Sequence, residues 1–327
     1  MADTMVVGNE VIKGAVRLAC RAPSLYNSQP WHWVTNGADL QLFLDPRRVM
    51  LVDRLHREAL VGCGAVLDHL RVAVAAAGWQ AHVDRFPNPD EPNHLAAITF
   101  TRMDRVTDDE RRRADAILLR RSDRLPFEPP LMWQSFEPQL HTIVAGDIVD
   151  LDVMSDDVRP QLADAYHIAE SLRLYDSLYH AELDWWTAPF EASEGISYDS
   201  LLTAAESERV DVRRVFPLVH HRERRTDIPE DYAKIVVLST ESDSATDALA
   251  CGEALSAVLL ECTMAGLATC TSTYLTELRV TRDLVAALLD YDRLPQALVR
   301  VGVAPAMEEV PPSTPRRRLD EVLRVRN

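Results

Sequence analysis

Two long apolar segments with matching glycines constrain the fold of this 327-residue chain more than any other feature. Gly64 and Gly78 bracket the first segment, Gly252 and Gly266 bracket the second, and each pair spans fourteen residues (78 − 64 and 266 − 252). Each member of the second pair lies 188 residues after its counterpart (252 − 64 and 266 − 78). Because both segments are apolar at most positions, they predict two central helices rather than two surface helices.

Strand patterns surround both predicted helices in the same order. Residues 40–44 and 235–238 precede the two helices, and residues 95–100 and 298–303 follow them, all rich in apolar residues. A strand–helix–strand order that recurs at one spacing predicts two copies of one module, packed about a pseudo-twofold axis. A chance match of glycines is the alternative to this duplication.

Three further segments have recognisable patterns. Thr107 and Glu110 have the spacing of a capping box and predict a helix that runs to about residue 119. Residues 160–186, rich in Leu, Tyr and Trp, predict another helix. Residues 187–229 are mixed in character and contain Gly195, Pro217 and a charged run at 222–225, so we expect a lid-like excursion from the core.

Net charge and the distribution of charged residues argue against nucleic-acid binding and against insertion into a membrane. The formal net charge of −16 disfavours a nucleic-acid backbone as a partner. Only Lys13 and Lys234 are lysines, so 33 of the 35 basic residues are Arg, whose forked donors suit phosphate. The first residues have no signal-peptide pattern, and charges interrupt every apolar run. We therefore expect a soluble cytoplasmic protein that does not enter a membrane.

The sequence contains no common motif of metal, hydrolase or dinucleotide chemistry. The five cysteines are an odd number without a Cys-x-x-Cys pair, which predicts reduced core residues. His220 and His221 are adjacent and lack spaced partner ligands, so we expect no metal site. No Gly-x-Ser-x-Gly or Gly-x-Gly-x-x-Gly pattern occurs, which argues against a serine hydrolase and a Rossmann site.

The segment from Arg21 to Trp33 interrupts the regular patterns. Pro23 ends the preceding helical run, because its ring nitrogen has no proton to donate. Four hydrogen-bonding side chains then follow within six residues: Ser24, Asn27, Ser28 and Gln29. We interpret this turn as a ligand cradle. A capped turn is the alternative, since Ser and Asn favour turns in any context.

Residues Pro23-Ser24-x-x-Asn27-x-Gln29-Pro30-Trp31 resemble the Pro-Ser-x-x-Asn-x-Gln-Pro-Trp segment of the FMN-dependent nitroreductase family. The whole chain is similar, end to end, to the Acg family of actinobacterial nitroreductase-like flavoproteins. This resemblance implies an α+β, nitroreductase-like fold in which two fused modules in one chain mimic the family homodimer. The expected halves are residues 1–117 and residues 118–327, with the lid-like excursion at about 187–229 in the second half.

The resemblance also implies where FMN binds. In the family, each FMN site combines segments from both subunits of the dimer. Arg120-Arg121-Ser122-Asp123-Arg124 and Pro315-Arg316-Arg317 match the segments that one subunit supplies, and the Pro-Ser-x-x-Asn segment matches the other. The predicted cofactor-binding residues are Pro23, Ser24, Asn27, Arg120, Ser122, Arg124, Thr271, Ser272, Thr273, Arg316 and Arg317.

Arg120, Arg124 and Arg316 are expected at the phosphate, because guanidinium groups donate paired, charge-assisted hydrogen bonds to it. Pro23, Ser24 and Asn27 are expected at the flavin ring, with Gln29 and Trp31 supporting the turn from behind. Residues 270–274 lie where the family has a Pro-x-Glu-Gly-like strip, and that motif is absent here. No catalytic side chain is expected, because the flavin carries the chemistry.

The reciprocal site lacks these motifs, so we expect one FMN per chain, in a monomer that acts as a pseudo-dimer. The leading hypothesis is an oxidoreductase in which NADH or NADPH reduces the flavin and a nitro or quinone-type acceptor reoxidises it. The alternative is a catalytically silent FMN storage or sequestration protein with a lid over the flavin. A partner-binding module that has lost FMN is a third hypothesis.

Overall fold

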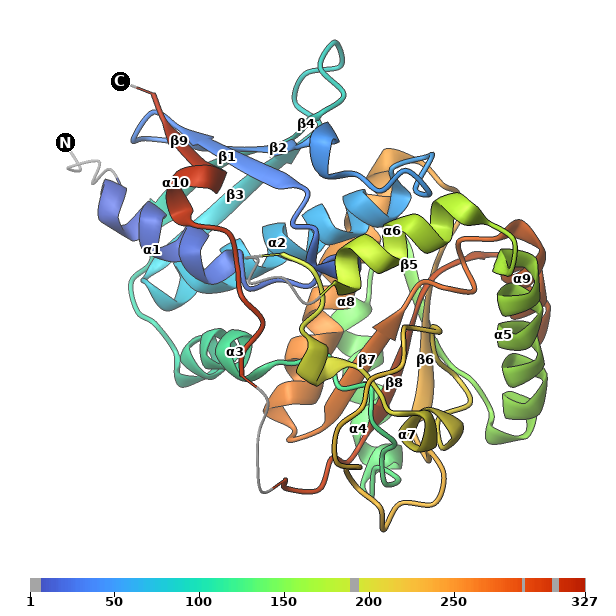
Figure 1. Cartoon of the computed structure of the whole chain (residues 1–327). Coiled ribbons are helices and arrows are strands. Elements are labelled where there is room, and N and C mark those ends of the chain that lie inside the picture. Colours follow the sequence, from blue (N-terminus) through green and yellow to red (C-terminus); the bar gives the residue numbers. More distant parts are fainter. Residues whose placement is uncertain (1–6, 189–193, 290–291, 308–311, 327) are drawn as a thin grey trace, which may run out of the picture.

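Two β-sheets lie on either side of a pair of long central helices in the computed structural model, which describes residues 7–188, 194–289, 292–307 and 312–326 (Figure 1). The five-stranded sheet has the order β3-β4-β2-β1-β9, and the four-stranded sheet has the order β5-β6-β8-β7. Helix α2 packs against the first sheet and α8 against the second. The fold is α+β, as predicted.

The strands of the first sheet are β1 (Trp31–Thr35), β2 (Leu40–Leu44), β3 (Trp79–Arg85), β4 (His94–Arg102) and β9 (Leu323–Val325). Those of the second are β5 (Val149–Val153), β6 (Lys234–Thr240), β7 (Ala268–Ser272) and β8 (Leu294–Gly302). The helices are α1 (Asn9–Ala19), α2 (Arg57–Ala76), α3 (Asp108–Leu119), α4 (Trp133–Val144), α5 (Arg159–Arg173), α6 (Ser177–Thr187), α7 (Ala204–Glu208), α8 (Ala245–Met264), α9 (Arg279–Leu289) and α10 (Leu319–Val322).

The two sheets repeat one topology. The order β3-β4-β2-β1 corresponds to β7-β8-β6-β5, and every neighbouring pair within these two sets is antiparallel. In each set a long helix follows the second strand: α2 comes after β2, and α8 comes after β6. Gly78 and Gly266 follow the ends of these helices with φ of +83° and +74°, the left-handed conformation that favours glycine at a helix C-terminus.

The two central helices touch at the glycines that the sequence singled out. A Cβ atom on Gly64 would lie 2.0 Å from the carbonyl oxygen of Leu249, and a Cβ on Gly252 would lie 2.0 Å from that of Val61. These contacts are reciprocal, because Leu249 lies 188 residues after Val61 (249 − 61). Reciprocal contact between equivalent residues is the signature of an isologous, twofold interface.

Burial confirms the predicted central position of the helices. Helix α2 is long and apolar enough to cross a membrane, but 83% of its apolar window is buried inside the protein. Such burial is typical of a core helix. The described residues contain no other helix with these properties.

The C-terminal tail returns to the first sheet. Strand β9 pairs in parallel with β1, with Trp33 opposite Leu323 and Thr35 opposite Val325. The preceding strand in the chain, β8 at residues 294–302, belongs to the second sheet. In Figure 1 the end of the chain therefore lies beside helix α1 and strand β1. This return carries residues 314–317 across the turn at residues 23–29.

Several local expectations are corrected. The single helix predicted over 160–186 is two helices, α5 and α6, because the chain turns between Leu174 and Asp176. Strands β3, β5, β7 and β9 were not predicted, although β3 and β5 alternate apolar and polar residues as half-buried strands do. The capping box of Thr107 and Glu110 is confirmed at the start of α3. Of the predicted excursion 187–229, residues 189–193 lie outside the described residues, and the rest contains only short helical turns.

We predict that Gly64→Ala and Gly252→Ala each destabilise the protein by about 3 kcal/mol or more, because the new methyl group meets main chain that cannot move without separating the helices. The measurement is the free energy of unfolding in urea. Gly14→Ala is the matched control, since Gly14 lies inside α1 and a Cβ atom added there would have nothing within 4 Å. It should stabilise by about 0.5–1 kcal/mol. Equal effects at all three sites would contradict the close contact.

Candidate functional site

Two adjoining cavities share the turn at residues 23–26 and the segment at residues 122–124 as parts of their walls. The apolar cavity, of about 1090 Å³, extends from the turn at 23–26 past α2 and β7 to residues 196–218. The basic cavity, of about 1040 Å³, extends from the same turn to residues 120–125 and the tail at 312–316. Both volumes include space open to solvent. The residues shared by both cavities are Pro23, Ser24, Tyr26, Ser122, Arg124 and Ile196.

The basic cavity gathers guanidinium groups from three separate segments. Arg21 follows α1, Arg120 ends α3, and Arg316 comes from the C-terminal tail. Within the described residues, no carboxylate forms an ion pair within 4 Å of any of these three. Their hydrogen bonds go instead to main-chain oxygens: Arg120 and Arg316 both donate to the Arg21 carbonyl, at 3.3 and 3.1 Å.

Electrostatic repulsion accompanies this arrangement. Burial, reinforced by the neighbouring charge of Arg21, lowers the pKa of Arg120 to about 10. Burial, together with Arg120 and Arg21, lowers the pKa of Arg316 to about 9. The Nε atoms of Arg21 and Arg120 are buried and have no hydrogen-bond partner in the described part of the chain. Like charges that are held together and partly desolvated form a strong binding site for an anion.

The turn that forms one wall is held in an unusual conformation. Tyr26, Asn27 and Gln29 have φ of +51°, +58° and +51°, which is uncommon for residues other than glycine. The Ser24 hydroxyl accepts a hydrogen bond from the Gln29 N–H at 2.9 Å. The tail reinforces the turn, because the Asn27 amide donates to the Pro315 carbonyl at 3.1 Å.

The lid-like excursion covers the apolar cavity. Ile196, Leu202, Val212, Phe216 and Leu218 from this excursion all line the cavity opposite α2 and β7. Arg124, from the segment after α3, also lines this cavity, and its guanidinium carbon lies 5.0 Å from the centre of the Phe216 ring. Burial lowers the pKa of Arg124.

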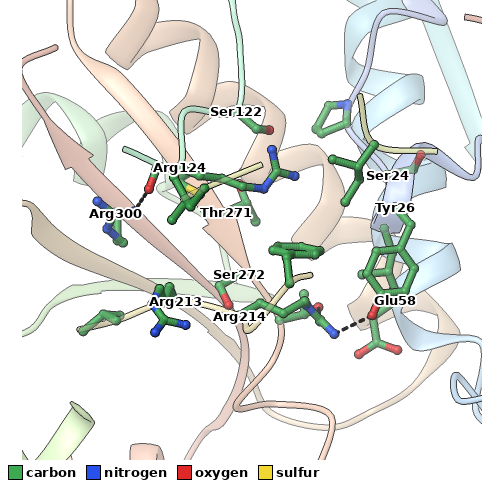
Figure 2. Close-up of a pocket in the computed structure, with 18 of the residues that line it drawn as sticks. Ser24, Tyr26, Glu58, Ser122, Arg124, Arg213, Arg214, Thr271, Ser272 and Arg300 are labelled. Atoms are coloured by element: carbon green, nitrogen blue, oxygen red, sulfur yellow. Dashed lines mark hydrogen bonds between the residues drawn. The ribbon is translucent and has the colours of Figure 1, made fainter. Parts of the chain in front are cut away.

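Arg214 connects the excursion to both halves of the protein. It is buried, forms an ion pair with Glu277, and donates to the Tyr26 hydroxyl at 2.8 Å (Figure 2). Its guanidinium carbon also lies 5.2 and 5.0 Å from the ring centres of Tyr26 and Tyr274. These contacts fasten the excursion over the cavity.

A buried carboxyl group also lines the apolar cavity. Glu58, in the first turn of α2, is 6% exposed and forms an ion pair with Arg57 (Figure 2 labels Glu58). The pKa of Glu58 is raised to about 7, because burial raises it more than the Arg57 charge lowers it, and the nearby Asp53 carboxyl also raises it.

The structure brings most of the predicted site residues together. Pro23, Ser24, Ser122 and Arg124 line both cavities; Thr271, Ser272 and Thr273 line the apolar cavity, while Asn27, Arg120 and Arg316 line the basic cavity. Arg317 lines neither. Its main-chain N–H donates to the Gln29 side chain at 2.9 Å, and its side chain donates to the Gln29 and Trp31 carbonyls. Gln29 and Trp31 are completely buried, in keeping with the supporting role predicted for them.

Sequence reasoning missed several residues of the site. Arg21 lies two residues before the recognised motif, and that position was the one available signal for it. Tyr26, Glu58, Arg213, Arg214 and Arg300 also line the cavities, but no local pattern distinguishes them from core or surface residues. Among the described residues, no group of three His, Cys, Asp or Glu side chains is arranged to hold a metal ion. All five cysteines are free, and four are buried.

Comparison with known proteins places this geometry in a family. No family model matches the chain. The sequence is 60% identical over 327 residues to a protein of Mycobacterium tuberculosis (strain ATCC 25618 / H37Rv) named "Putative NAD(P)H nitroreductase acg", covering 100% of this chain and 98% of the relative. The chain belongs to the Acg family of nitroreductase-like proteins. The resemblance drawn from the sequence is thereby confirmed.

Other similarities are weaker. A second relative from the same strain, "Uncharacterized protein Rv3127", is 50% identical over 321 residues, covering 97% of this chain and 93% of the relative. Among solved structures, the FMN-dependent nitroreductase NfnB from Mycobacterium smegmatis, in complex with NADPH, is 18% identical with a TM-score of 0.40. That match covers 67% of this chain and all of the other, and it is too distant to assign roles to residues of this site.

The raised pKa of Glu58 predicts a pH dependence of stability. Its folded-state value of about 7 exceeds the ordinary 4.5, so the native protein binds more protons than the unfolded chain between these pH values. The stabilisation by Glu58 is therefore present below pH 4.5 and is lost as the pH rises through 7. We expect the free energy of unfolding to fall by about 2 kcal/mol more in the wild type than in Glu58→Gln over this range. Urea unfolding at several pH values measures it, and parallel profiles would contradict it.

Proposed function

We propose that this chain is an FMN-binding, NAD(P)H-dependent oxidoreductase of nitroreductase type that reduces a nitro or quinone-type acceptor. The observation that carries the proposal is the junction of a cavity rich in unneutralised arginines with a largely apolar cavity, both lined by the family motifs. The 60% identical relative named as an NAD(P)H nitroreductase supports the reaction class.

The basic cavity fits the phosphate of FMN. Arg21, Arg120 and Arg316 offer guanidinium donors, and two of their buried Nε atoms lack partners. A phosphate carrying nearly two negative charges would relieve the repulsion among these cations and accept their free hydrogen bonds. Of the three arginines expected at the phosphate, Arg120 and Arg316 keep this role, while Arg124 lies at the junction of the two cavities.

The apolar cavity fits the flavin ring. Pro23 and Ser24 form one wall, and Thr271, Ser272 and Thr273 lie at β7, an edge strand whose outer side has main-chain groups outside the sheet pairing. Arg124 would stand beside both the ring and the ribityl chain. When bound, FMN would supply the two-electron redox chemistry, while these residues orient it and exclude water.

We propose one FMN per chain, held between the halves 1–117 and 118–327 of a monomeric pseudo-dimer. The repeated strand order and the reciprocal contact of Gly64 with Gly252 support an internal duplication. A twofold arrangement has two equivalent seams, that is, two interfaces between the halves. Only one of them carries the Arg120–Arg124 segment and the C-terminal tail, and this asymmetry favours a single site.

A storage or sequestration role is the second candidate. The contacts of Arg214 with Glu277 and Tyr26 fasten the excursion over the apolar cavity, where a nicotinamide would have to enter. An excursion that stays closed would protect bound FMN from reduction.

For FMN binding, we predict that Arg120→Gln and Arg316→Gln each raise the dissociation constant about tenfold or more, because each removes a charge-assisted contact to phosphate. Titration of apo-protein with FMN, followed by flavin fluorescence, measures this constant. Arg318→Gln is the matched control, since Arg318 is exposed on the same tail and pairs with Asp320 at 2.7 Å. Wild-type affinity in the double variant Arg120→Gln/Arg316→Gln, or two FMN bound per wild-type chain, would contradict the assignment.

For turnover, we expect NADPH or NADH to bleach the oxidised flavin absorbance of the holoprotein under anaerobic conditions, because the nicotinamide reaches the apolar cavity. A nitro or quinone acceptor should then restore the absorbance. Stopped-flow spectroscopy makes the measurement. If neither nicotinamide bleaches the flavin while dithionite does, the storage role replaces the reductase role.

A further inference from the structure

Four arginines line the apolar cavity, and their charges are balanced unequally (Figure 2). Arg214 forms an ion pair with the buried Glu277, and Arg300 forms one with the buried Asp231 at 2.6 Å. Arg124 and Arg213 form no ion pair within 4 Å among the described residues. The cavity wall therefore has two guanidinium groups with no described carboxylate within ion-pair distance.

Arg213 is the less engaged of these two residues. It lies on the excursion, is half-buried, and donates from Nε to the Ser207 carbonyl at 2.9 Å. Its two terminal amino groups form no hydrogen bond or ion pair within the part of the chain that the structure describes. Two carboxylates influence it from a distance: Asp211 pairs with Arg159 at 2.7 Å, and Glu170 lies on α5 beyond ion-pair range.

The surroundings of Arg213 make its charge costly to leave unpaired. Burial lowers its pKa; the Glu170 carboxylate opposes this effect, and the neighbouring Arg300 guanidinium adds to it. The excursion also carries apolar cavity residues close to it in sequence, Val212, Phe216 and Leu218. A partly desolvated guanidinium beside an apolar wall binds a planar anion on an apolar body well, since the anion receives two charge-assisted hydrogen bonds.

We infer that Arg213 is a specificity-determining residue that selects acceptors bearing a carboxylate or a similar planar anion. The inference rests on the proposed function, in which Arg124 and the basic cavity serve FMN and leave Arg213 for the second substrate. The apolar body of the acceptor would lie against Phe216 and Leu218, with its anionic group toward Arg213.

The test compares two probes of nearly equal size, 4-nitrobenzoate and 4-nitrobenzamide, on oxidised holoprotein without nicotinamide. Isothermal titration calorimetry gives both dissociation constants independently of turnover. We expect the wild type to bind the carboxylate about tenfold or more tightly than the amide. Arg213→Gln should abolish that preference by weakening the carboxylate alone, and Arg213→Lys should keep part of it. Arg279→Gln, at a side chain that is 94% exposed on α9, controls for the change in net charge.

Three results would overturn the inference. They are equal binding of the two probes to the wild type, no binding of either probe, and an unchanged preference in Arg213→Gln. A loss of FMN affinity in Arg213→Gln would also overturn it, because Arg213 would then serve the cofactor. Failure of the proposed function is distinguishable: the probes would show the Arg213-dependent preference while neither NADPH nor NADH bleaches the flavin.

Discussion

The close contact between α2 and α8 is the constraint on which the rest of the structure depends. Gly64 and Gly252 bring the two helix backbones so near that a single methyl group would meet a carbonyl oxygen. Each helix carries its own sheet, so this contact fixes the distance and orientation of the two sheets. The cavities lie along the seam that the contact defines. Small residues at a helix crossing thus determine the dimensions of a site built from distant segments.

The seam gains its chemical character from chain segments that cross it. The turn at 23–29 leads into β1 of the first sheet, while residues 120–124 lie beside β7 of the second, with Ser122 bridging to Thr269. The tail then returns to pair β9 with β1 and brings Arg316 to the Arg21 carbonyl. Three cationic segments meet where no partner carboxylate is found among the described residues, although the whole chain has a net charge of −16. Local convergence, rather than total charge, decides what this seam attracts.

The excursion forms the opposite wall of the apolar cavity, and its two neighbouring arginines differ in how their charges are balanced. Arg214 is neutralised by Glu277 and held by Tyr26, so it acts as a structural fastening. Arg213, its neighbour in sequence, has no ion-pair partner within the described residues and lines the same cavity. Adjacent side chains on an irregular segment can meet different surroundings, and these two arginines therefore differ in their partners although their chemistry is identical.

The sequence by itself determined the two apolar helices, their glycines, the flanking strands, and the motif residues that line the seam, because periodicity and turn chemistry are local properties. It also indicated that Arg120 and Arg316 lie near the turn at residues 23–29, through the family resemblance. Only the tertiary structure decided that Arg317 ties the tail to Gln29 and Trp31 instead of lining a cavity. The same holds for Arg21, Glu58, Arg213 and Arg214, whose roles depend on burial and on partners far away in sequence. Which charge is paired and which remains available is set by packing, and no local pattern records it.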